Sequence, residues 1–481
     1  MNSLRSILFF IASTALLGLG GCASMGDSAP QAKWLDANTL ATKLPATPAQ
    51  WPSERWWERY GDPQLDQLIA TALRDSPGLR IAEARVRQAQ GSASIAEAAT
   101  QPGGGIDASL SREMFTTTGF IPPPWAGSYD WNNNLAAHVS YDLDLWGRHR
   151  SALAAAVAET RVAEAESQMA RLGLENRIVR AYLQLALHYT LKDSVEETLG
   201  NRQRALDITR KKQAAGLATE VEISLLEAAI PRLQTQIEQH AEAITLLRHQ
   251  LAALIGQGPA AGEDIERPTL NLADDDWLHL PTNVPADLIG RRPDVAARRW
   301  GAEAATRDIE VAKAAFYPNI NLMAFIGFQA IGFSHFINND SAVRGIAPAV
   351  SLPIFDGARL RGNLAARTAG YDMAVESYNQ TLLHALENVA GALASAQSAE
   401  QQKRLIDAGV VAAKRAHDLA RKGHAAGLTD FLAVLSSRLD LIQQQDMQAR
   451  IMAYRWQSYA DLMLALGGGW SGDLPQQEQQ P

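Results

Sequence analysis

Two very long segments without proline, one in each half, constrain the fold of this chain more than any other feature. The runs Arg148–Ala215 and Arg359–Ala426 each contain 68 residues. Proline inside a helix removes a hydrogen bond and clashes with the preceding turn, so its absence permits unbroken helices. At 1.5 Å per residue, each run predicts a helix of roughly 100 Å.

Apolar residues recur along both runs with a period close to 3.5. In the second run the spacing alternates between three and four, at Val375, Tyr378, Leu382, Ala385, Val389, Ala392 and Ala396. The first run shows the same stripe at Ile178, Tyr182, Leu185 and Tyr189. This period is typical of coiled coils, so we expect each long helix to pack against helical partners along one seam.

The two halves repeat one plan. Proline pairs bracket a shorter helical segment ahead of each run, Pro77 with Pro102 and, 216 positions later, Pro293 with Pro318. An Ala-Ala-Gly-Leu motif ends each run, at 214–217 and 425–428, and helical periodicity then resumes. Two short helices stacked end to end can match one long helix in length. Each half therefore predicts one long helix packed against two shorter ones.

Segments that alternate between apolar and polar residues lie between the short and long helical segments. The apolar positions are Leu135, Ala137, Val139, Tyr141, Leu143 and Leu145 in one segment, and Leu322, Ala324, Ile326 and Phe328 in another. Shorter alternating segments surround Ile106 and Val350. Period two over about ten residues is typical of outer-membrane strands. A water-soluble sheet with one solvated face would show the same alternation.

The amino terminus has the pattern of a bacterial lipoprotein signal. Arg5 precedes the apolar stretch Ile7–Leu19, and small residues lead to Cys22, the one cysteine of the chain. Leu19-Gly20-Gly21-Cys22 resembles a lipobox, which implies a diacylglycerol on the Cys22 thiol and an acyl chain on the new amino terminus. Ala23 resembles the signal for sorting to the outer membrane. After residue 21, no stretch of 18 apolar residues predicts a spanning helix.

Composition and motifs exclude several functional classes. The formal net charge of -8 provides no electrostatic footprint for nucleic acid, and one cysteine forms neither an internal disulfide nor a Cys-based zinc cluster. Asp274–Asp276 lacks the alternating ligands of a calcium loop, and His240 and His249 lack the spacing of a zinc site. We therefore predict no enzyme, no catalytic residue, no metal and no cofactor other than the lipid on Cys22.

Four strands are too few for a membrane barrel, which needs about eight. Because an open sheet edge is not tolerated in lipid, membrane-spanning strands would require the chain to oligomerise. Two copies would give eight strands and three would give twelve. Periodicity alone does not decide between them.

Several short motifs occur in a characteristic order. They are Trp56-Trp57, Asp62-Pro63-x-Leu65, Asp142-Leu-Asp-Leu-Trp-Gly147, Arg291-Arg-Pro-Asp294, Ala315-Phe-Tyr-Pro318 and Leu352-Pro-Ile-Phe-Asp-Gly357. Over nearly the whole mature chain they resemble the TolC-like outer-membrane efflux factor family, in its lipoprotein branch of OprM and NodT type. The resemblance implies a mainly α fold with a transmembrane β-barrel part. Tandem-repeated long helical hairpins form a periplasmic tunnel, and four strands per chain contribute to a twelve-stranded barrel in a homotrimer.

The same resemblance implies a function and a location. Members export drugs or other small toxic molecules passively, from an inner-membrane pump through a periplasmic adaptor to the exterior. The location is the outer membrane, with a lipid anchor and a long periplasmic extension. The alternative is a lipid-anchored periplasmic adaptor, but adaptors carry one hairpin between all-β domains, and here two hairpins repeat.

Family resemblance also places the functional residues. The periplasmic tips, which close the tunnel and contact the adaptor, correspond to Ala215, Gly216, Leu217, Ala426, Gly427 and Leu428. Gate candidates near the tips are Glu222, Asp430, Arg210 and Arg421, which could pair between neighbouring chains or be solvated helix charges. Many members carry Asp where Ala433 and Ser436 stand here. In the barrel, Asp107, His138, Asp142 and Asp144 are expected to face the lumen.

These expectations divide the chain into five parts. They are a signal peptide (1–21), a lipidated extended segment (22–62), a first repeat (63–270), a second repeat (271–470) and a disordered tail (471–481).

Overall fold

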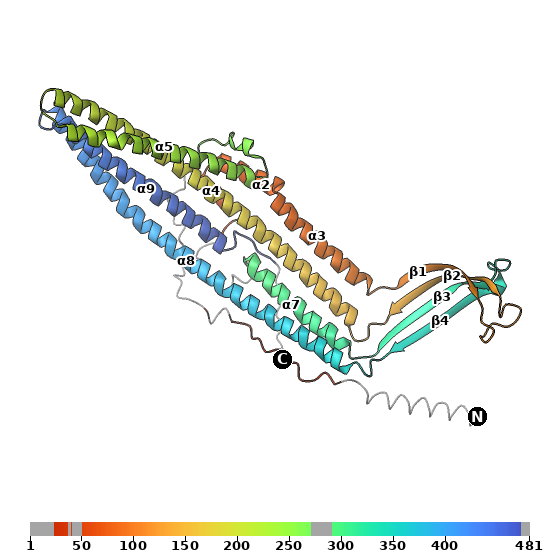
Figure 1. The fold of residues 1–481 in the computed structure, drawn as a ribbon. Coiled ribbons are helices and arrows are strands. Elements are labelled where there is room, and N and C mark those ends of the chain that lie inside the picture. The colour runs from red at the N-terminus through yellow and green to blue at the C-terminus, as the bar shows by residue number, and fades with distance from the viewer. Residues whose placement is uncertain (1–23, 37–39, 41–50, 271–290, 473–481) are drawn as a thin grey trace.

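The computed structural model describes residues 24–36, 40, 51–270 and 291–472. The signal peptide, Cys22 and most of the expected tail lie outside the described residues, as does the start of the second repeat at residue 271. Figure 1 shows an elongated molecule, with a long helical body and a sheet that extends from one end of it.

Two long helices form the body of the molecule. Helix α4 runs from Arg148 to Ala214, and helix α8 runs from Gly357 to Ala425. The two proline-free runs therefore predicted both helices to within two residues at each end.

Each long helix packs against two shorter helices that follow one another along its length (Figure 1). Helix α4 contacts α5 (Glu220–Leu254) and α3 (Pro77–Ala98). Helix α8 contacts α9 (Phe431–Ala465) and α7 (Pro293–Ala314) in the same way. The predicted repeat is thus confirmed, and contacts of α4 with α7 and α9 join its two halves.

Most of the predicted seam is buried, and its remaining members Ala392 and Tyr189 are partly buried against the main core. Val375, Tyr378, Leu382, Ala385, Val389 and Ala396 of α8 are at most 2% exposed, and so are Ile178, Tyr182 and Leu185 of α4. Near the middle of the body, the short segments η1 (Trp56–Tyr60) and α2 (Pro63–Asp75) pack into the main core. Trp56 and Trp57 are buried in this core, which is the packing role expected for aromatic anchors.

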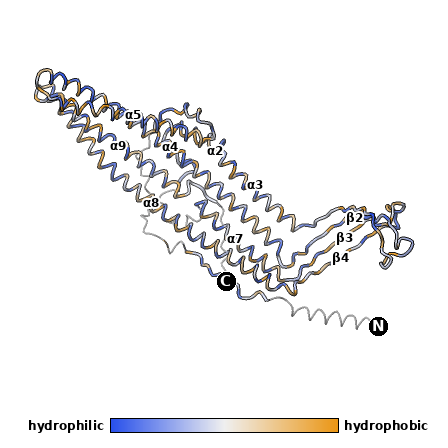
Figure 2. Tube along the Cα trace, viewed as in Figure 1, coloured by the Kyte–Doolittle hydropathy of each residue, from blue (hydrophilic) through white to orange (hydrophobic). Residues whose placement is uncertain are grey.

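Four antiparallel strands form one sheet in the order β1-β2-β3-β4. They are β1 (Gly103–Met114), β2 (Tyr129–Asp142), β3 (Asn319–Ile331) and β4 (Ala342–Ser351). Their register aligns Ile106, Ala137, Ile326 and Arg344 in one row, so alternate residues of all four strands share a face. Figure 2 shows hydrophobic and hydrophilic residues alternating along these strands.

Strand β2 ends earlier than its alternation predicted. Leu143 and Leu145 lie beyond Asp142, in the turn that leads into α4. Asp144 in this turn has a φ angle of 41°, which is incompatible with an extended strand. The chain leaves the sheet here, and the Asp144 carboxylate accepts hydrogen bonds from backbone N–H groups in the first turn of α4.

Residues 24–36 form no helix or strand and follow the surface of α8 (Figure 1). The Asp372 carboxylate accepts hydrogen bonds from the backbone N–H groups of Gln31 and Ala32, at 2.9 and 3.0 Å. The Asn379 side chain bonds the backbone of Leu35 and Lys33. Within the described parts of the chain, no helix is both long and apolar enough to cross a membrane. The described residues also include two short 3-10 segments, η2 (Pro259–Gly262) and η3 (Asn339–Ser341).

Candidate gate and channel surfaces

The two helical tips, at the end of the body away from the sheet, have the same backbone geometry. Gly216 and Gly427 adopt left-handed conformations with φ angles of 74° and 72°. The N–H of Leu217 donates to Lys212 O, and that of Leu428 to Gly423 O, each at 2.8 Å. This is the Schellman arrangement that ends a helix, and it requires a residue able to adopt positive φ.

The turns also expose one leucine each. Leu217 is 77% exposed and Leu428 is 81% exposed, while Ala215 and Ala426 are the C-cap residues of α4 and α8. The six residues predicted for the tips therefore lie together at one end of the molecule (Figure 1). The structure provides two apolar, solvent-exposed contact points there.

Glu222 has a structural role at the first tip. Its carboxylate accepts a hydrogen bond from the Thr219 N–H at 2.8 Å, and the Thr219 hydroxyl accepts one from the Glu222 N–H. This capping box satisfies two N–H groups at the start of α5.

Asp430 joins the two hairpins. It is the N-cap of α9, where its side chain accepts a hydrogen bond from the Leu432 N–H. Its second oxygen pairs with the ammonium group of Lys212 at the end of α4. The hydrogen bond from Lys212 holds the pKa of Asp430 below its usual value, so Asp430 is ionised near neutral pH.

The arginines predicted near the gate are placed differently. Arg210 pairs with Glu227 of the neighbouring α5, with 2.6 Å between guanidinium nitrogen and carboxylate oxygen. Arg421 has no ion-pair partner among the described residues. Sequence reasoning missed Lys212, because the repeat offers no signal for it: Gly423 occupies the matching position of the second hairpin.

Three of the four residues predicted for the lumen lie on the more polar face of the sheet. The His138 ring nitrogen Nδ1 is 2.9 Å from a carboxylate oxygen of Asp107, diagonally across β1 and β2. Asp142, on the same face at the end of β2, accepts a hydrogen bond from the Asn321 side chain at 2.7 Å.

Asp144 requires a correction, because it does not belong to the strand on which alternation placed it. Its carboxylate accepts hydrogen bonds from the backbone N–H groups of His149 and Arg150, both at 3.0 Å, at the start of α4. A residue in this position fixes the junction between strand and helix.

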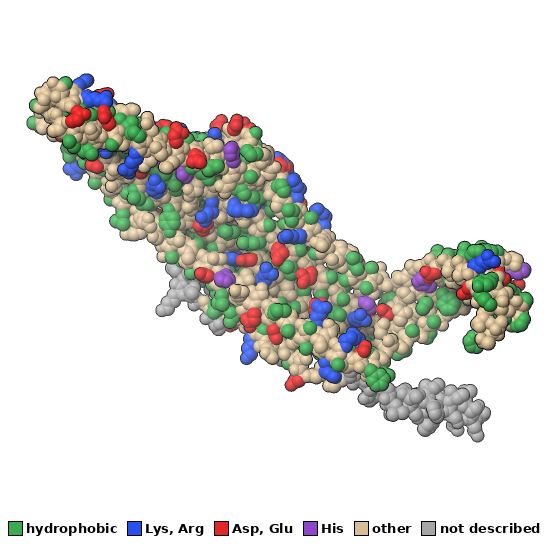
Figure 3. Space-filling view, in the orientation of Figure 1, with side chains coloured by type: hydrophobic (Ala, Val, Ile, Leu, Met, Phe, Trp, Pro, Cys, Tyr) green, Lys and Arg blue, Asp and Glu red, His purple; other side chains and the backbone are tan. Residues whose placement is uncertain are grey.

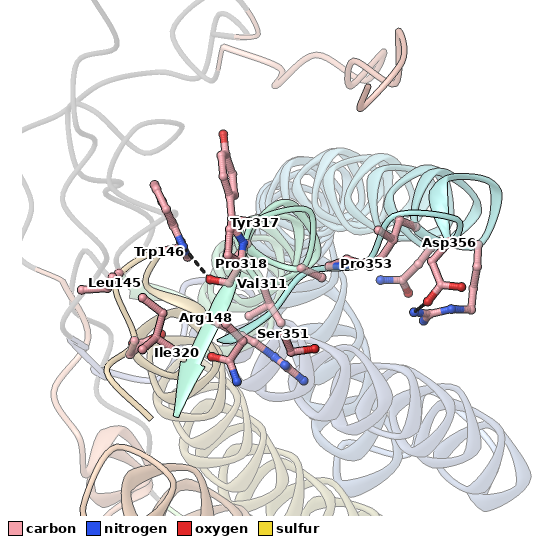
Figure 4. A pocket seen from close by; sticks show the side chains of 17 residues that line it. Leu145, Trp146, Arg148, Val311, Tyr317, Pro318, Ile320, Ser351, Pro353 and Asp356 are labelled. Atoms are coloured by element: carbon pink, nitrogen blue, oxygen red, sulfur yellow. Dashed lines mark hydrogen bonds and ion pairs between the residues drawn. The ribbon is translucent and has the colours of Figure 1, made fainter. Parts of the chain in front are cut away.

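The same junction contains a cavity of about 490 Å³ between the β2–α4 turn, the end of α7 and the start of α8 (Figure 4). The Trp146 ring stacks on Tyr317 with a centroid distance of 4.5 Å, and its N–H donates to Pro318 O at 2.9 Å. Three of the sequence motifs therefore line this cavity and connect the helical body to the sheet, the third being Leu352–Gly357 through Pro353 and Asp356. No cluster of three metal-binding side chains occurs in the described part of the chain.

Comparison with known proteins identifies the protein family to which this chain belongs. The family profile described as "Outer membrane efflux protein" matches residues 68–257 and 284–468, one segment in each repeat. The chain belongs to the outer membrane efflux protein family. Its two matched segments include all four strands and both helical hairpins.

Relatives cover much of the chain. It is 42% identical over 359 residues to the fusaric acid resistance protein FusA of Burkholderia cepacia, covering 73% of this chain and 67% of FusA. It is 30% identical over 470 residues to the multidrug resistance outer membrane protein MdtP of Shigella flexneri, covering 96% and 95%. The pyoverdine export outer membrane protein OpmQ of Pseudomonas putida is 32% identical over 452 residues, covering 93% of each chain.

Solved structures show the same fold. The outer membrane protein VceC of Vibrio cholerae matches with a TM-score of 0.79 and 35% identity, over 87% of this chain and 100% of VceC. The outer-membrane channel OprN matches with a TM-score of 0.77 and 26% identity, over 92% and 97%. The protein is thus a TolC-like efflux channel of the outer membrane, as its motifs predicted, and the adaptor alternative is set aside.

Proposed function

We propose that three copies of this chain form a homotrimer in which their sheets join into one twelve-stranded barrel. The observation that carries this proposal is the open sheet, in which β1 and β4 each have one edge without a partner strand in the described chain. In lipid such edges must be paired, and the sheet has one mainly apolar face to meet the membrane. About eight strands leave an interior filled by side chains, so twelve are favoured for a pore.

The trimer would be the outer component of a tripartite efflux system. We propose that it passively exports drugs or other small toxic molecules, received from an inner-membrane pump through a periplasmic adaptor. The named functions of its relatives, in fusaric acid resistance, multidrug resistance and pyoverdine export, support this substrate class. We assign the chain no catalytic residue, because passive export requires an open channel and no chemical step.

A lipid on Cys22 would anchor each chain beside the barrel. Ser24, the first described residue, lies against the start of α8, where its carbonyl oxygen accepts a hydrogen bond from Arg361 at 3.4 Å. Ser24 thus places the described start of this segment close to the level at which strands meet helices. Acyl chains on Cys22 would enter the inner leaflet of the outer membrane at that level.

The helical tips would form the periplasmic gate and the adaptor contact. We propose that Leu217 and Leu428, with their neighbouring Ala and Gly residues, contact the adaptor. The charged groups Glu222, Asp430, Arg210 and Arg421 would surround the narrowest part of the tunnel. The pair between Lys212 and Asp430 supports a restraining role, since it ties the two hairpins of one chain together.

Purification from outer-membrane fractions tests the proposal. We expect a trimer that migrates as one species on gels without heating and separates into single chains after heating. The purified trimer should conduct ions in planar bilayers, and Cys22→Ser should lose incorporation of radiolabelled palmitate. A monomer without conductance would refute the trimeric channel.

A further inference from the structure

The apolar face of the sheet carries two charged side chains among its described residues. This face contains Ile106 and every second residue from it along β1, together with the residues that the register places in the same rows on the other strands. Its charged members are Arg112 and Arg344. Neither guanidinium group forms a hydrogen bond or an ion pair with another described residue.

The two arginines occupy equivalent places on the two edge strands. Arg112 is the third residue from the end of β1, and Arg344 is the third residue from the start of β4. Both of these strand ends lie at the loops farthest from the helical body (Figure 1). At that end of the sheet, Figure 3 shows basic side chains together with acidic, histidine and apolar ones.

Trimer formation would bring these arginines together in pairs. If β1 of one chain pairs with β4 of the next, Arg112 and Arg344 of neighbouring chains lie on the same face at a similar distance from the loops. Arg112 lies 14 residues beyond the end of α3, and Arg344 lies 13 residues before the start of α8, which places both at a similar height above the body. Each of the three junctions would then present two guanidinium groups toward lipid.

Such a pair favours the binding of an anion. A positive charge on the lipid face of an outer-membrane strand costs about 2–4 kcal/mol at the midplane and about 0–1 kcal/mol near the interfaces. Two adjacent positive charges also repel each other. Guanidinium groups form paired hydrogen bonds with phosphate oxygens, and a bound phosphate would offset both the cost of burial and the repulsion.

We propose that each junction between neighbouring chains binds the phosphate of a phosphorylated glycolipid in the outer leaflet. Aromatic side chains support an interfacial position, because Trp131 lies opposite Arg112 and packs against Phe333 with a centroid distance of 5.4 Å. This inference rests on the proposed trimer, since one chain alone separates the two arginines across the sheet.

Lipid-dependent stability of the purified full-length trimer tests this site. The protein in detergent is incubated with diphosphoryl lipid A, phosphatidylglycerol or inorganic phosphate, and the temperature at which the trimer separates into chains is read on gels. We expect diphosphoryl lipid A to raise this temperature, with a smaller effect of phosphatidylglycerol and none of free phosphate. The double variant R112Q/R344Q should remain trimeric and conducting but lose the shift.

Matched variants separate a specific site from a general effect of charge. R85Q/R87Q removes the same charge from α3, away from the sheet, and should keep the full shift. R112K/R344K keeps the charge without the paired hydrogen bonds and should retain part of the temperature shift. A trimer that diphosphoryl lipid A does not stabilise, or that it stabilises equally in R112Q/R344Q, would overturn the lipid site and leave the channel intact. A wild-type monomer would instead refute both proposals.

Discussion

The Glu175 side chain of α4 is 1% exposed, although it carries an ionisable group. Burial raises the pKa of Glu175 to about 7, and a hydrogen bond from Arg171 at 3.0 Å offsets part of the rise. The Trp56 side chain also lowers this pKa, so Arg171 and Trp56 both oppose the effect of burial. Because Glu175 lies in the helical body, its titration should affect the stability of that body.

Replacing this carboxyl group should change how stability depends on pH. The folded pKa lies above the unfolded value of 4.5, so the folded state binds more protons between these values, and its stability falls as pH rises toward 7. The full penalty, about 3 kcal/mol, applies above pH 7. Glu175→Gln removes it, and thermal unfolding followed by circular dichroism should show a larger stabilisation by Gln at pH 8 than at pH 5. An equal effect at both pH values would show that Glu175 titrates normally.

Each acidic residue at the tips both carries a charge and caps a helix. Conservative substitutions can separate the effect of the charge from the effect of the cap. Asparagine caps a helix start as well as aspartate, and glutamine can replace glutamate in a capping box. Asp430→Asn and Glu222→Gln therefore remove charge while keeping the caps.

We expect the double variant D430N/E222Q to open the gate more often, mainly because D430N breaks the pair with Lys212. Exposed pairs contribute about 0.2–1 kcal/mol each, so opening should rise a few-fold. Sensitivity of cells to vancomycin measures the leak, and E222Q alone is the control expected to resemble wild type. If D430N/E222Q leaves vancomycin sensitivity unchanged, these acids do not restrain the gate.

At the scale of helices and turns, glycines with positive φ angles differ in how much space surrounds them. Around Gly216 and Gly427 an added Cβ would meet no atom within 4 Å. At Gly467, after α9, the Cβ would lie 1.8 Å from the backbone oxygen of Arg291. At the tip turns, backbone conformation alone therefore restricts which residues can replace glycine. At the end of α9, close packing restricts the replacement as well.

Alanine substitutions should separate these two situations. Gly216→Ala and Gly427→Ala place a Cβ in the left-handed region, which costs about 1–2 kcal/mol, and the trimer should still assemble. Gly467→Ala adds a backbone clash and should strongly reduce the yield of trimer. Heat-dependent gel migration of outer-membrane fractions compares the three variants. Normal assembly of Gly467→Ala would show that the α9 end relaxes readily.

Periodic sequence patterns made the helices and strands predictable. The features that the sequence did not predict depend on individual side-chain hydrogen bonds and ion pairs. The absence of proline and the period of 3.5 predicted α4 and α8 because both patterns extend over many turns. The end of β2 was missed because apolar alternation continues past it, whereas one carboxylate, that of Asp144, turns the chain into α4. The pair between Lys212 and Asp430 joins residues 218 positions apart and has no periodic signal.

At the scale of the whole molecule, the more polar face of the sheet sets the electrostatics of the pore. Asp107 and Asp142 lie on this face, together with His138. A trimer would repeat each carboxylate three times around the lumen, where low-dielectric walls strengthen its field. The structure therefore predicts a pore that prefers cations.

Reversal potentials measured across a salt gradient in planar bilayers test this preference. Wild-type channels should be cation-selective, and Asp107→Asn should reduce the selectivity, since the Asp107 side chain is 71% exposed and can act on passing ions. Asp264→Asn removes the same charge from the segment after η2, outside the barrel, and should leave the reversal potential unchanged. Anion selectivity in the wild type, or equal effects of the two variants, would mean that Asp107 does not face the pore. In that case the two faces of the sheet would have to exchange their assignments, and the glycolipid site on Arg112 and Arg344 would be lost with them.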